Sequence, residues 1–446
     1  MQLSQIMQVE KWLSLTEIQP YHVKLSRPIV SEIIKWQIDQ YREFIIRNNL
    51  SVDNIRLLSN IIIALENECL KCLQPVINAT GIIVHTNLGR SPLPKMVWDN
   101  ASDAMCRYSN LELNLHNGKR GDRMGILPTM LNRYFGGESA LLVNNNAAAI
   151  HLILKAFAQG KEVIVSRGEQ VQIGGGFRIP EILAESGAIL RDVGTTNITT
   201  VDDYLDAITD NTSMVLIVHQ SNYYIEGFSK QADIIQLAQK LPKHILLVVD
   251  QGSGNQLNGI SGEKTVSHYL KAGAHLVCFS GDKILGGPQS GIILGQKSII
   301  NTLVKHPMMR VFRPGKETYI LLEKLLIHYL NKDNDVMSRV QTVLNHPLEW
   351  HKERAEQIAI IAPNQLTLIN EKYLIGGGTT PKAQFDTWAI EVKIAINPHL
   401  IIEQLRNNKP SIIATIKKDK VIIYPVTLFD DELERVKKVL QQILAN

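Results

Sequence analysis

An aspartate and a lysine stand at the ends of two apolar runs of the chain. Asp250 closes the run ILLVVD (245–250), and Lys283 follows the run LVCFSG (276–281). Both runs have the length and composition of buried strands. Because the carboxyl ends of strands in an open parallel sheet meet at one edge, we expect the carboxylate and the amine to lie close together.

This pair suits the chemistry of pyridoxal phosphate. A lysine amine forms a Schiff base with the aldehyde of that cofactor, and a carboxylate pairs with its pyridine nitrogen and strengthens the ring as an electron sink. Asp250 and Lys283 are 33 positions apart, which is compatible with two supports for one ring. A buried salt bridge or a solvated loop lysine fits the same spacing, so the spacing alone does not decide.

The residues around Lys283 favour the cofactor. In the segment FSGDKILGGPQSG, Gly286 and Gly287 permit tight backbone turns beside a flat ring, and Ser280 offers a hydroxyl to a phosphate. A plain turn before the next strand is the alternative for the glycine pair, and for two glycines alone it is the commoner one.

A further strand end offers a phosphate site. The segment VNNNAAA (143–149) is a predicted strand-to-helix junction that contains Asn145, Asn146 and Ala147. Backbone N–H groups at the start of a helix bind phosphate, and small alanines let the helix approach the ligand closely. Asparagine also caps helices without any ligand, and for this motif alone a cap is the commoner role.

Three arginines lie in turns that contain glycine or proline: Arg90, Arg310 and Arg313. Arginines recognise phosphate-like anions through forked hydrogen bonds, so these three are candidates for substrate binding. The alternative for any single arginine is surface charge, which is the commoner role.

Seven short apolar runs, separated by helix-like segments, predict one large α/β domain over residues 73–330. Their alternation with helices indicates a mostly parallel sheet that is covered on both faces. The runs are ALLVNNN (140–146), EVIVSRG (162–168), ILRDVG (189–194), MVLIVH (214–219), ILLVVD (245–250), LVCFSG (276–281) and GIILG (291–295).

The two ends of the chain differ from this pattern. Residues 1–72 are predicted to be helical, with Asp53 near the start of one helix, and they hold eight basic and eight acidic residues. Residues 331–446 predict a small α+β domain with a hairpin turn at 417–419. A small domain that closes over a large one places the active site in the cleft between them.

The composition is that of an ordinary globular protein. Of 446 residues, 45% are apolar and 20% charged, and the net charge of +4 does not by itself indicate a nucleic-acid-binding protein. Cys69 and Cys72 have no second ligand pair nearby, which favours structural thiols over a metal or redox site. With neither a signal peptide nor a membrane-spanning run, we expect a cytoplasmic protein.

Together the motifs closely resemble those of the bacterial selenocysteine synthases, the L-seryl-tRNA(Sec) selenium transferases. The matching blocks occur in family order over about residues 25 to 380. They are INATGIIVHTNLGRSPLP (77–94), LVNNNAAA (142–149), VSRGEQVQIGGGFRIPE (165–181), VGTTN (193–197), SNYYIEGF (221–228), DQGSGN (250–255) and FSGDKILGGPQSGIILG (279–295).

The resemblance implies a fold-type I pyridoxal-phosphate transferase, aminotransferase-like, that converts seryl-tRNA(Sec) to selenocysteinyl-tRNA(Sec) with selenium from selenophosphate. Lys283 would carry the cofactor and move the α-proton of serine, and Asp250 would pair with the pyridine nitrogen. Arg90, Arg310 and Arg313 would bind the selenium donor. The family also implies that the helical segment 1–72 binds tRNA, and that the chain assembles into a homo-decamer.

The sequence departs from the family pattern at three positions. Ile198 stands where an arginine is usual, Gln172 where a glutamate is usual, and Gln251 where leucine is common. A paralogous lyase or β-replacement enzyme that acts on a small amino acid is therefore kept as an alternative. A non-catalytic relative is disfavoured, because such a protein has no chemical reason to keep both Lys283 and Asp250.

Overall fold

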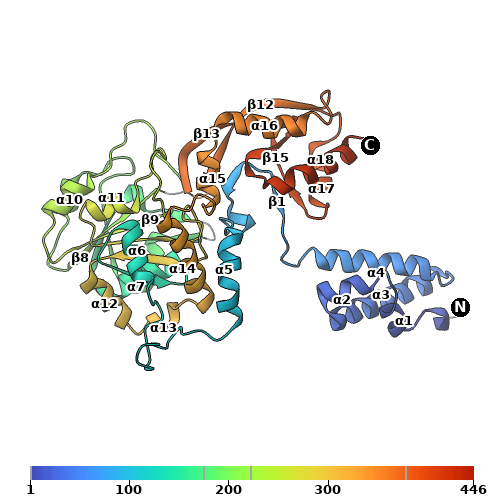
Figure 1. Ribbon diagram of the computed structural model, residues 1–446, viewed down its shortest axis with the longest axis horizontal. Coiled ribbons are helices and arrows are strands. Elements are labelled where there is room, and N and C mark those ends of the chain that lie inside the picture. The colour runs from blue at the N-terminus through green and yellow to red at the C-terminus, as the bar shows by residue number, and fades with distance from the viewer. Residues whose placement is uncertain (1–2, 174–175, 221–222, 377–378, 446) are drawn as a thin grey trace. The chain divides into compact units, whose positions relative to one another are not determined.

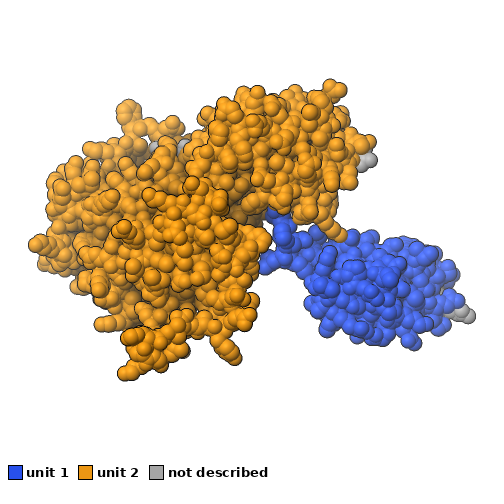
Figure 2. Space-filling view, viewed as in Figure 1, with its two compact units in different colours: residues 1–76 blue, residues 77–446 orange. Residues whose placement is uncertain are grey.

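The computed structural model describes residues 3–173, 176–220, 223–376 and 379–445. It contains two compact units, Met1–Val76 and Ile77–Asn446, which Figure 2 shows in different colours. Each unit has its own hydrophobic core. The predicted division of the chain into 1–72, 73–330 and 331–446 stays a prediction.

The first unit is helical, as the sequence predicts. Its buried centre includes Trp12 and residues of the two longest helices, such as Ile34 and Ile61. Cys69 packs against this core, whereas Cys72 is exposed. The helices are η1 (Leu3–Gln5), α1 (Val9–Leu13), α2 (Gln19–Leu25), α3 (Arg27–Asn48) and α4 (Asn54–Cys69).

The centre of the second unit is a seven-stranded sheet in the order β3-β11-β10-β9-β8-β4-β7 (Figure 1). All seven predicted runs form its strands, and β11 alone runs antiparallel to its neighbours. The strands are β3 (Ser139–Val143), β4 (Glu162–Ser166), β7 (Ile189–Val193), β8 (Thr212–Val218), β9 (Leu246–Gly252), β10 (Leu276–Ser280) and β11 (Gly291–Gly295).

Both faces of this sheet are buried, which explains why its strands are continuous apolar runs. In β8, Met214 and Leu216 belong to one core cluster and Val215 to another on the opposite face. The surrounding helices are η2 (Thr86–Leu88), α5 (Lys95–Cys106), α6 (Leu127–Phe135), α7 (Asn146–Phe157), η3 (Arg167–Glu169), α8 (Ile179–Ser186), α9 (Val201–Asp206), α10 (Ile234–Lys240), α11 (Val266–Lys271), α12 (Lys297–Lys305), α13 (Met309–Phe312) and α14 (Lys316–Asn331).

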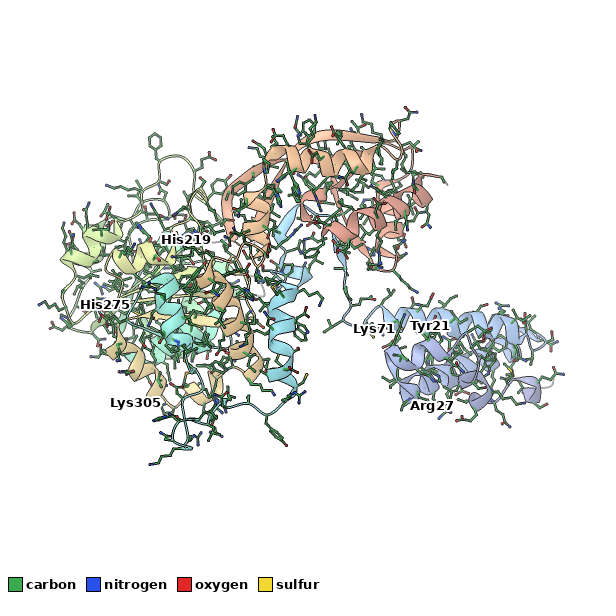
Figure 3. The ribbon with its side chains drawn as sticks, in the orientation of Figure 1. Tyr21, Arg27, Lys71, His219, His275 and Lys305 are labelled. Carbon is green, nitrogen blue, oxygen red and sulfur yellow. The ribbon has the colours of Figure 1, made fainter. Side chains whose placement is uncertain are left out.

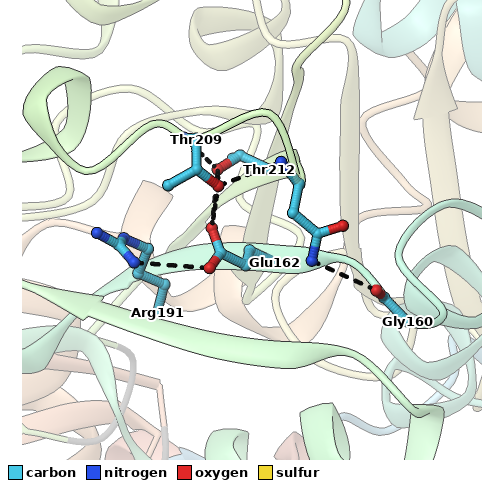
Figure 4. A network of polar contacts seen from close by, with 6 residues as sticks. Gly160, Glu162, Arg191, Thr209 and Thr212 are labelled. Atoms are coloured by element: carbon cyan, nitrogen blue, oxygen red, sulfur yellow. Dashed lines mark hydrogen bonds and ion pairs between the residues drawn. The ribbon is translucent and has the colours of Figure 1, made fainter.

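Polar groups at the amino ends of the strands have a structural role. Glu162, at the start of β4, accepts hydrogen bonds from the hydroxyls of Thr209 (2.6 Å) and Thr212 (3.2 Å), and Arg191 lies 3.5 Å away (Figure 4). These hydrogen bonds lower the pKa of Glu162. The network joins β4, β7 and the start of β8 at the amino ends of the strands. Asp250 lies at the other end of the sheet, near the carboxyl end of β9.

The C-terminal part forms a second sheet in the order β15-β16-β13-β12-β2. One edge strand of this sheet, β2 (Ile82–Val84), comes from far away in the chain and pairs with β12. A separate two-stranded sheet joins β1 (Ile77–Asn78) to β14. The remaining elements are β5 (Gln172–Ile173), β6 (Phe177–Arg178), α15 (Arg339–Asn345), α16 (Leu348–Ala359), β12 (Leu366–Gly376), β13 (Thr379–Val392), α17 (Pro398–Arg406), β14 (Ile412–Ile413), β15 (Thr415–Lys417), β16 (Lys420–Ile423), η5 (Pro425–Thr427) and α18 (Asp430–Leu444).

The predicted hairpin is confirmed: Lys417 pairs with Lys420, and the two residues between them have positive φ angles of 48° and 59°. Such angles at both central positions are typical of a tight two-residue turn. Among the residues that the structure describes, no helix is both long and apolar enough to cross a membrane.

The start of α4 provides a test of the helical unit. Asp53 caps this helix, because its Oδ1 accepts hydrogen bonds from the backbone N–H groups of Ile55 (2.9 Å) and Arg56 (3.1 Å). Asp53→Ala should cost about 1 kcal/mol of local stability and speed amide exchange over residues 54–69 about fivefold. Hydrogen-exchange mass spectrometry of the full chain measures this.

Asp39→Ala is the control, because among the described residues Asp39 forms only an exposed ion pair with Arg42. Equal exchange over 54–69 in both variants would contradict the capping role of Asp53.

Candidate active site

The sheet order brings Asp250 and Lys283 to one edge. Asp250 lies in β9, opposite Val218 of β8 and Cys278 of β10, and it is only 4% exposed. Lys283 lies three residues beyond β10 and is 7% exposed. Adjacent parallel strands thus support the two groups, as the sequence predicts.

Burial changes the acid–base properties of both groups. It raises the pKa of Asp250, and the hydrogen bond from Asn146 and the nearby charges of Lys283 and His219 oppose this rise. Burial also lowers the pKa of Lys283, and the guanidinium of Arg90 lowers it further, whereas Asp250 opposes the shift. A lysine with a lowered pKa is a better nucleophile and base near neutral pH.

The turn that carries Lys283 is fixed by backbone contacts. Gly281 N–H donates to Ser290 O (2.9 Å), Gly286 N–H to Lys283 O (3.1 Å) and Ile284 N–H to Ser253 O (3.1 Å). Gly286 has a φ of +73°, and a Cβ there would lie 2.5 Å from Cβ of Ser338. Any other residue at position 286 would clash with Ser338 and strain the backbone, so the turn requires a glycine there.

The junction of β3 and α7 lies beside the buried pair. Asn145 caps α7 by accepting a hydrogen bond from Ala148 N–H (2.9 Å), so the capping role weighed for this motif is present. Asn146 donates from Nδ2 to Oδ1 of Asp250 (2.8 Å), and Ala147 follows in the first turn. The buried Oδ1 of Asn146 has no hydrogen-bond partner among the described residues.

Two other predicted residues border the Lys283 turn. Ser280 is the last residue of β10, opposite Gly291 of β11, and it is partly exposed. Arg90 has a φ of 69° in a tight turn, and its Nη1 donates to Thr86 Oγ1 (3.2 Å). The next residue, Ser91, donates its N–H to Asp282 O (3.1 Å), which ties this turn to the neighbour of Lys283.

Arg310 and Arg313 line a cavity of about 400 Å³. Arg120, Arg123 and Glu112 line the same cavity. The carboxylate of Glu112 forms ion pairs with Arg120 (2.8 Å), with Arg123 and, at 4.0 Å, with Arg313. Neither Arg90 nor Lys283 lines this cavity. The structure therefore brings Arg90 to the buried pair but gathers the other two arginines elsewhere.

A histidine and a glutamate extend the site beyond the residues predicted for it. His219, labelled in Figure 3, directly follows β8, and its Nε2 lies 2.8 Å from Oε1 of Glu263. Both line a cavity of about 530 Å³. The strand end pointed to His219, but Glu263 lies in the loop GISGEK (259–264), where no sequence signal marked it.

The same cavity contains a second buried carboxyl. Burial raises the pKa of Glu169 to about 7, although its Oε2 accepts a hydrogen bond from Val218 N–H (2.9 Å) and His219 lies nearby. A carboxyl group with this pKa changes between its protonated and its ionised form near neutral pH.

The three departures from the family pattern have distinct surroundings. Gln251 is fully buried, and its side chain bonds to Ser253 Oγ (2.6 Å) and Gly254 N–H (2.6 Å). Gln172 accepts a hydrogen bond from Arg178 Nε (2.8 Å). Ile198 is 41% exposed, and its backbone bonds to Thr195.

These residues fit pyridoxal phosphate. A buried amine with a lowered pKa and a buried carboxylate influence each other electrostatically, and the aldehyde and the pyridine nitrogen of the cofactor require two such groups. The N-terminus of the twelve-residue helix α7 lies next to them, where a phosphate is favoured. The partnerless Oδ1 of Asn146 leaves one buried acceptor available to a ligand.

The chain is similar to known proteins over most of its length. The model of the L-seryl-tRNA selenium transferase family matches residues 76–429. The L-seryl-tRNA(Sec) selenium transferase of Nautilia profundicola is 39% identical and covers 94% of both chains. That of Carboxydothermus hydrogenoformans is 38% identical over 99% of this chain and 98% of its own.

Among solved structures, a D-glucosaminate-6-phosphate ammonia-lyase has a TM-score of 0.61 at 20% identity, covering 83% of this chain and 96% of its own. The predicted fold class is confirmed: a fold-type I, aminotransferase-like α/β enzyme with a helical N-terminus. The chain belongs to the L-seryl-tRNA selenium transferase family.

Proposed function

We propose that this protein binds pyridoxal phosphate through Lys283 and converts seryl-tRNA(Sec) to selenocysteinyl-tRNA(Sec), with selenophosphate as the selenium donor. The observation that carries the proposal is the buried pair of Lys283 and Asp250, with Asn146 beside it, in a chain of this family. The names of the curated relatives favour this function over the paralogous lyase.

The cofactor, when bound, supplies the electron sink that makes loss of the serine α-proton and β-hydroxyl possible. Asp250 would pair with the pyridine nitrogen, and the hydrogen bond from Asn146 holds its carboxyl group in place. Ser280 and the N-terminus of α7, with Asn145 and Ala147, would hold the phosphate.

Lys283 moves the proton. Its lowered pKa leaves more of the Nζ amine neutral near pH 7 than in a free lysine, so Nζ can accept the proton from serine Cα. The turn contacts hold the backbone on either side of this residue, which limits the positions that Nζ can reach. Proton transfer by Lys283 should therefore rise with pH through a pKa below that of ordinary lysines.

The arginines serve the anionic donor. Arg90, beside Lys283, would position selenophosphate or the leaving phosphate near the reacting carbon. The resemblance implies that Arg310 and Arg313 also bind the donor, although the described structure gathers them in a separate cavity with Arg120, Arg123 and Glu112. The tRNA would be bound by the helical unit, and the decameric assembly implied by the family stays a prediction.

The function is tested by incubating the pure holoenzyme with serine-charged tRNA(Sec), with and without selenophosphate, and by analysing the esterified amino acid. Selenocysteine should appear only with selenophosphate. Serine that persists on the tRNA while free amino acids are consumed would overturn the proposal in favour of a lyase.

Lys283→Ala should abolish the covalent adduct that borohydride traps between the protein and pyridoxal phosphate, because the reacting amine is gone. The adduct is measured by the mass of the intact chain. Lys305→Ala, which removes an exposed lysine of α12, is the control and should trap the cofactor like the wild type. An unchanged adduct in the Lys283 variant would refute the assignment.

Arg313→Ala should raise the KM for selenophosphate about tenfold or more, because one charged hydrogen-bond partner of the anion is lost. The rate at which serine loses its hydroxyl without donor should stay unchanged. Steady-state kinetics with Arg107→Ala, an exposed arginine after α5, provides the control. An equal loss of donor-independent elimination would contradict a role in donor binding.

A further inference from the structure

The contact of His219 with Glu263 is among the most enclosed in the second unit. The side chain of Glu263 is 1% exposed and that of His219 is 13% exposed, and their closest atoms are 2.8 Å apart. A carboxylate at this distance accepts a hydrogen bond from Nε2–H of the imidazole, which fixes both the tautomer and the plane of the ring.

Glu263 is itself held by other polar groups. Its Oε2 accepts hydrogen bonds from Ser253 Oγ (3.1 Å) and Gln251 Nε2 (3.4 Å). Gln251 also donates to Lys264 O (3.2 Å), next to Glu263 in the chain. A buried carboxylate with several donors keeps one orientation, so it can impose that orientation on His219.

This cluster is joined to the predicted cofactor residues. The backbone N–H of His219 donates to Asp250 O (2.9 Å), and Ser253 O accepts from Ile284 N–H (3.1 Å), the residue after Lys283. The carboxylate of Glu263 also acts electrostatically on Lys283. These contacts link His219 to Asp250 and Glu263 to the turn that carries Lys283.

We propose that Glu263 is a positioning residue: it holds His219 in one tautomer and one ring plane, so that the imidazole contacts the bound pyridoxal-phosphate ring beside Asp250. This inference rests on the proposed function, because it needs the cofactor at Lys283. Gln251, which replaces the leucine common in the family, supports the same carboxylate through its amide. His219 touches the cofactor, whereas Glu263 acts only through His219.

Glu263→Gln tests the proposal, because the amide keeps the size of the side chain but no longer fixes which imidazole nitrogen carries the proton. The dissociation constant of pyridoxal phosphate for the full-length apoprotein should rise roughly tenfold, and the visible absorption band of the bound cofactor should shift. Glu226→Gln, the same change at an exposed glutamate, is the matched control and should leave both unchanged.

A double-mutant cycle separates positioning from a general structural effect. In a His219→Phe background, Glu263→Gln should change neither the dissociation constant nor the absorption band further. If the two substitutions weaken cofactor binding independently, Glu263 does not act through His219 and the inference is overturned. Wild-type binding and absorption in the single Glu263→Gln variant would also overturn it.

A failure of the proposed function would give a different result from a failure of the inference about Glu263. If the wild-type chain itself takes up no pyridoxal phosphate, the cofactor assignment is wrong, and the inference about Glu263 falls with it. If the wild type and Glu226→Gln bind the cofactor and Glu263→Gln binds it like them, only the inference about Glu263 is overturned. The proposed function then still stands.

Discussion

The burial of a carboxylate and an amine at the ends of two neighbouring strands is the constraint on which the rest of the site depends. Removing an isolated charge from water costs several kcal/mol, so neither Asp250 nor Lys283 is expected at this depth without compensating partners. Asn146 donates to the carboxylate, and the two opposite charges stabilise each other. The order β10-β9-β8 supplies this arrangement, because neighbouring strands deliver their ends to one edge.

The same constraint explains the polar groups around the pair. His219, after β8, bonds through its backbone to Asp250, and the loop after β9 returns to place Glu263 against the imidazole. Gln251 is fully buried, and its amide forms hydrogen bonds with Ser253, Gly254 and Lys264. A polar residue at a fully buried position is tolerated only with such partners. Ile198 lies half-exposed and bonds through its backbone alone, and nothing described around it explains the loss of an arginine.

Much of this arrangement could be predicted from the sequence because parallel strands buried on both faces are continuous apolar runs, whose ends are easy to find. Asp250 and Lys283 were recognised from those ends. Glu263 could not be found in this way, because a loop residue becomes part of the site only through long-range packing. The pairing of β2 with β12 was missed for the same reason, since it joins segments almost three hundred residues apart. The separate cavity of Arg313 also depends on tertiary contacts, here with Glu112.

An experimental structure of the protein with pyridoxal phosphate tests the central claim most directly. The account predicts continuous density from Nζ of Lys283 to the cofactor, with a carboxylate oxygen of Asp250 within hydrogen-bond distance of the pyridine nitrogen. It also predicts the phosphate at the N-terminus of α7 and the imidazole of His219 against the ring. A cofactor joined to another lysine, or a pyridine nitrogen turned away from Asp250, would contradict it.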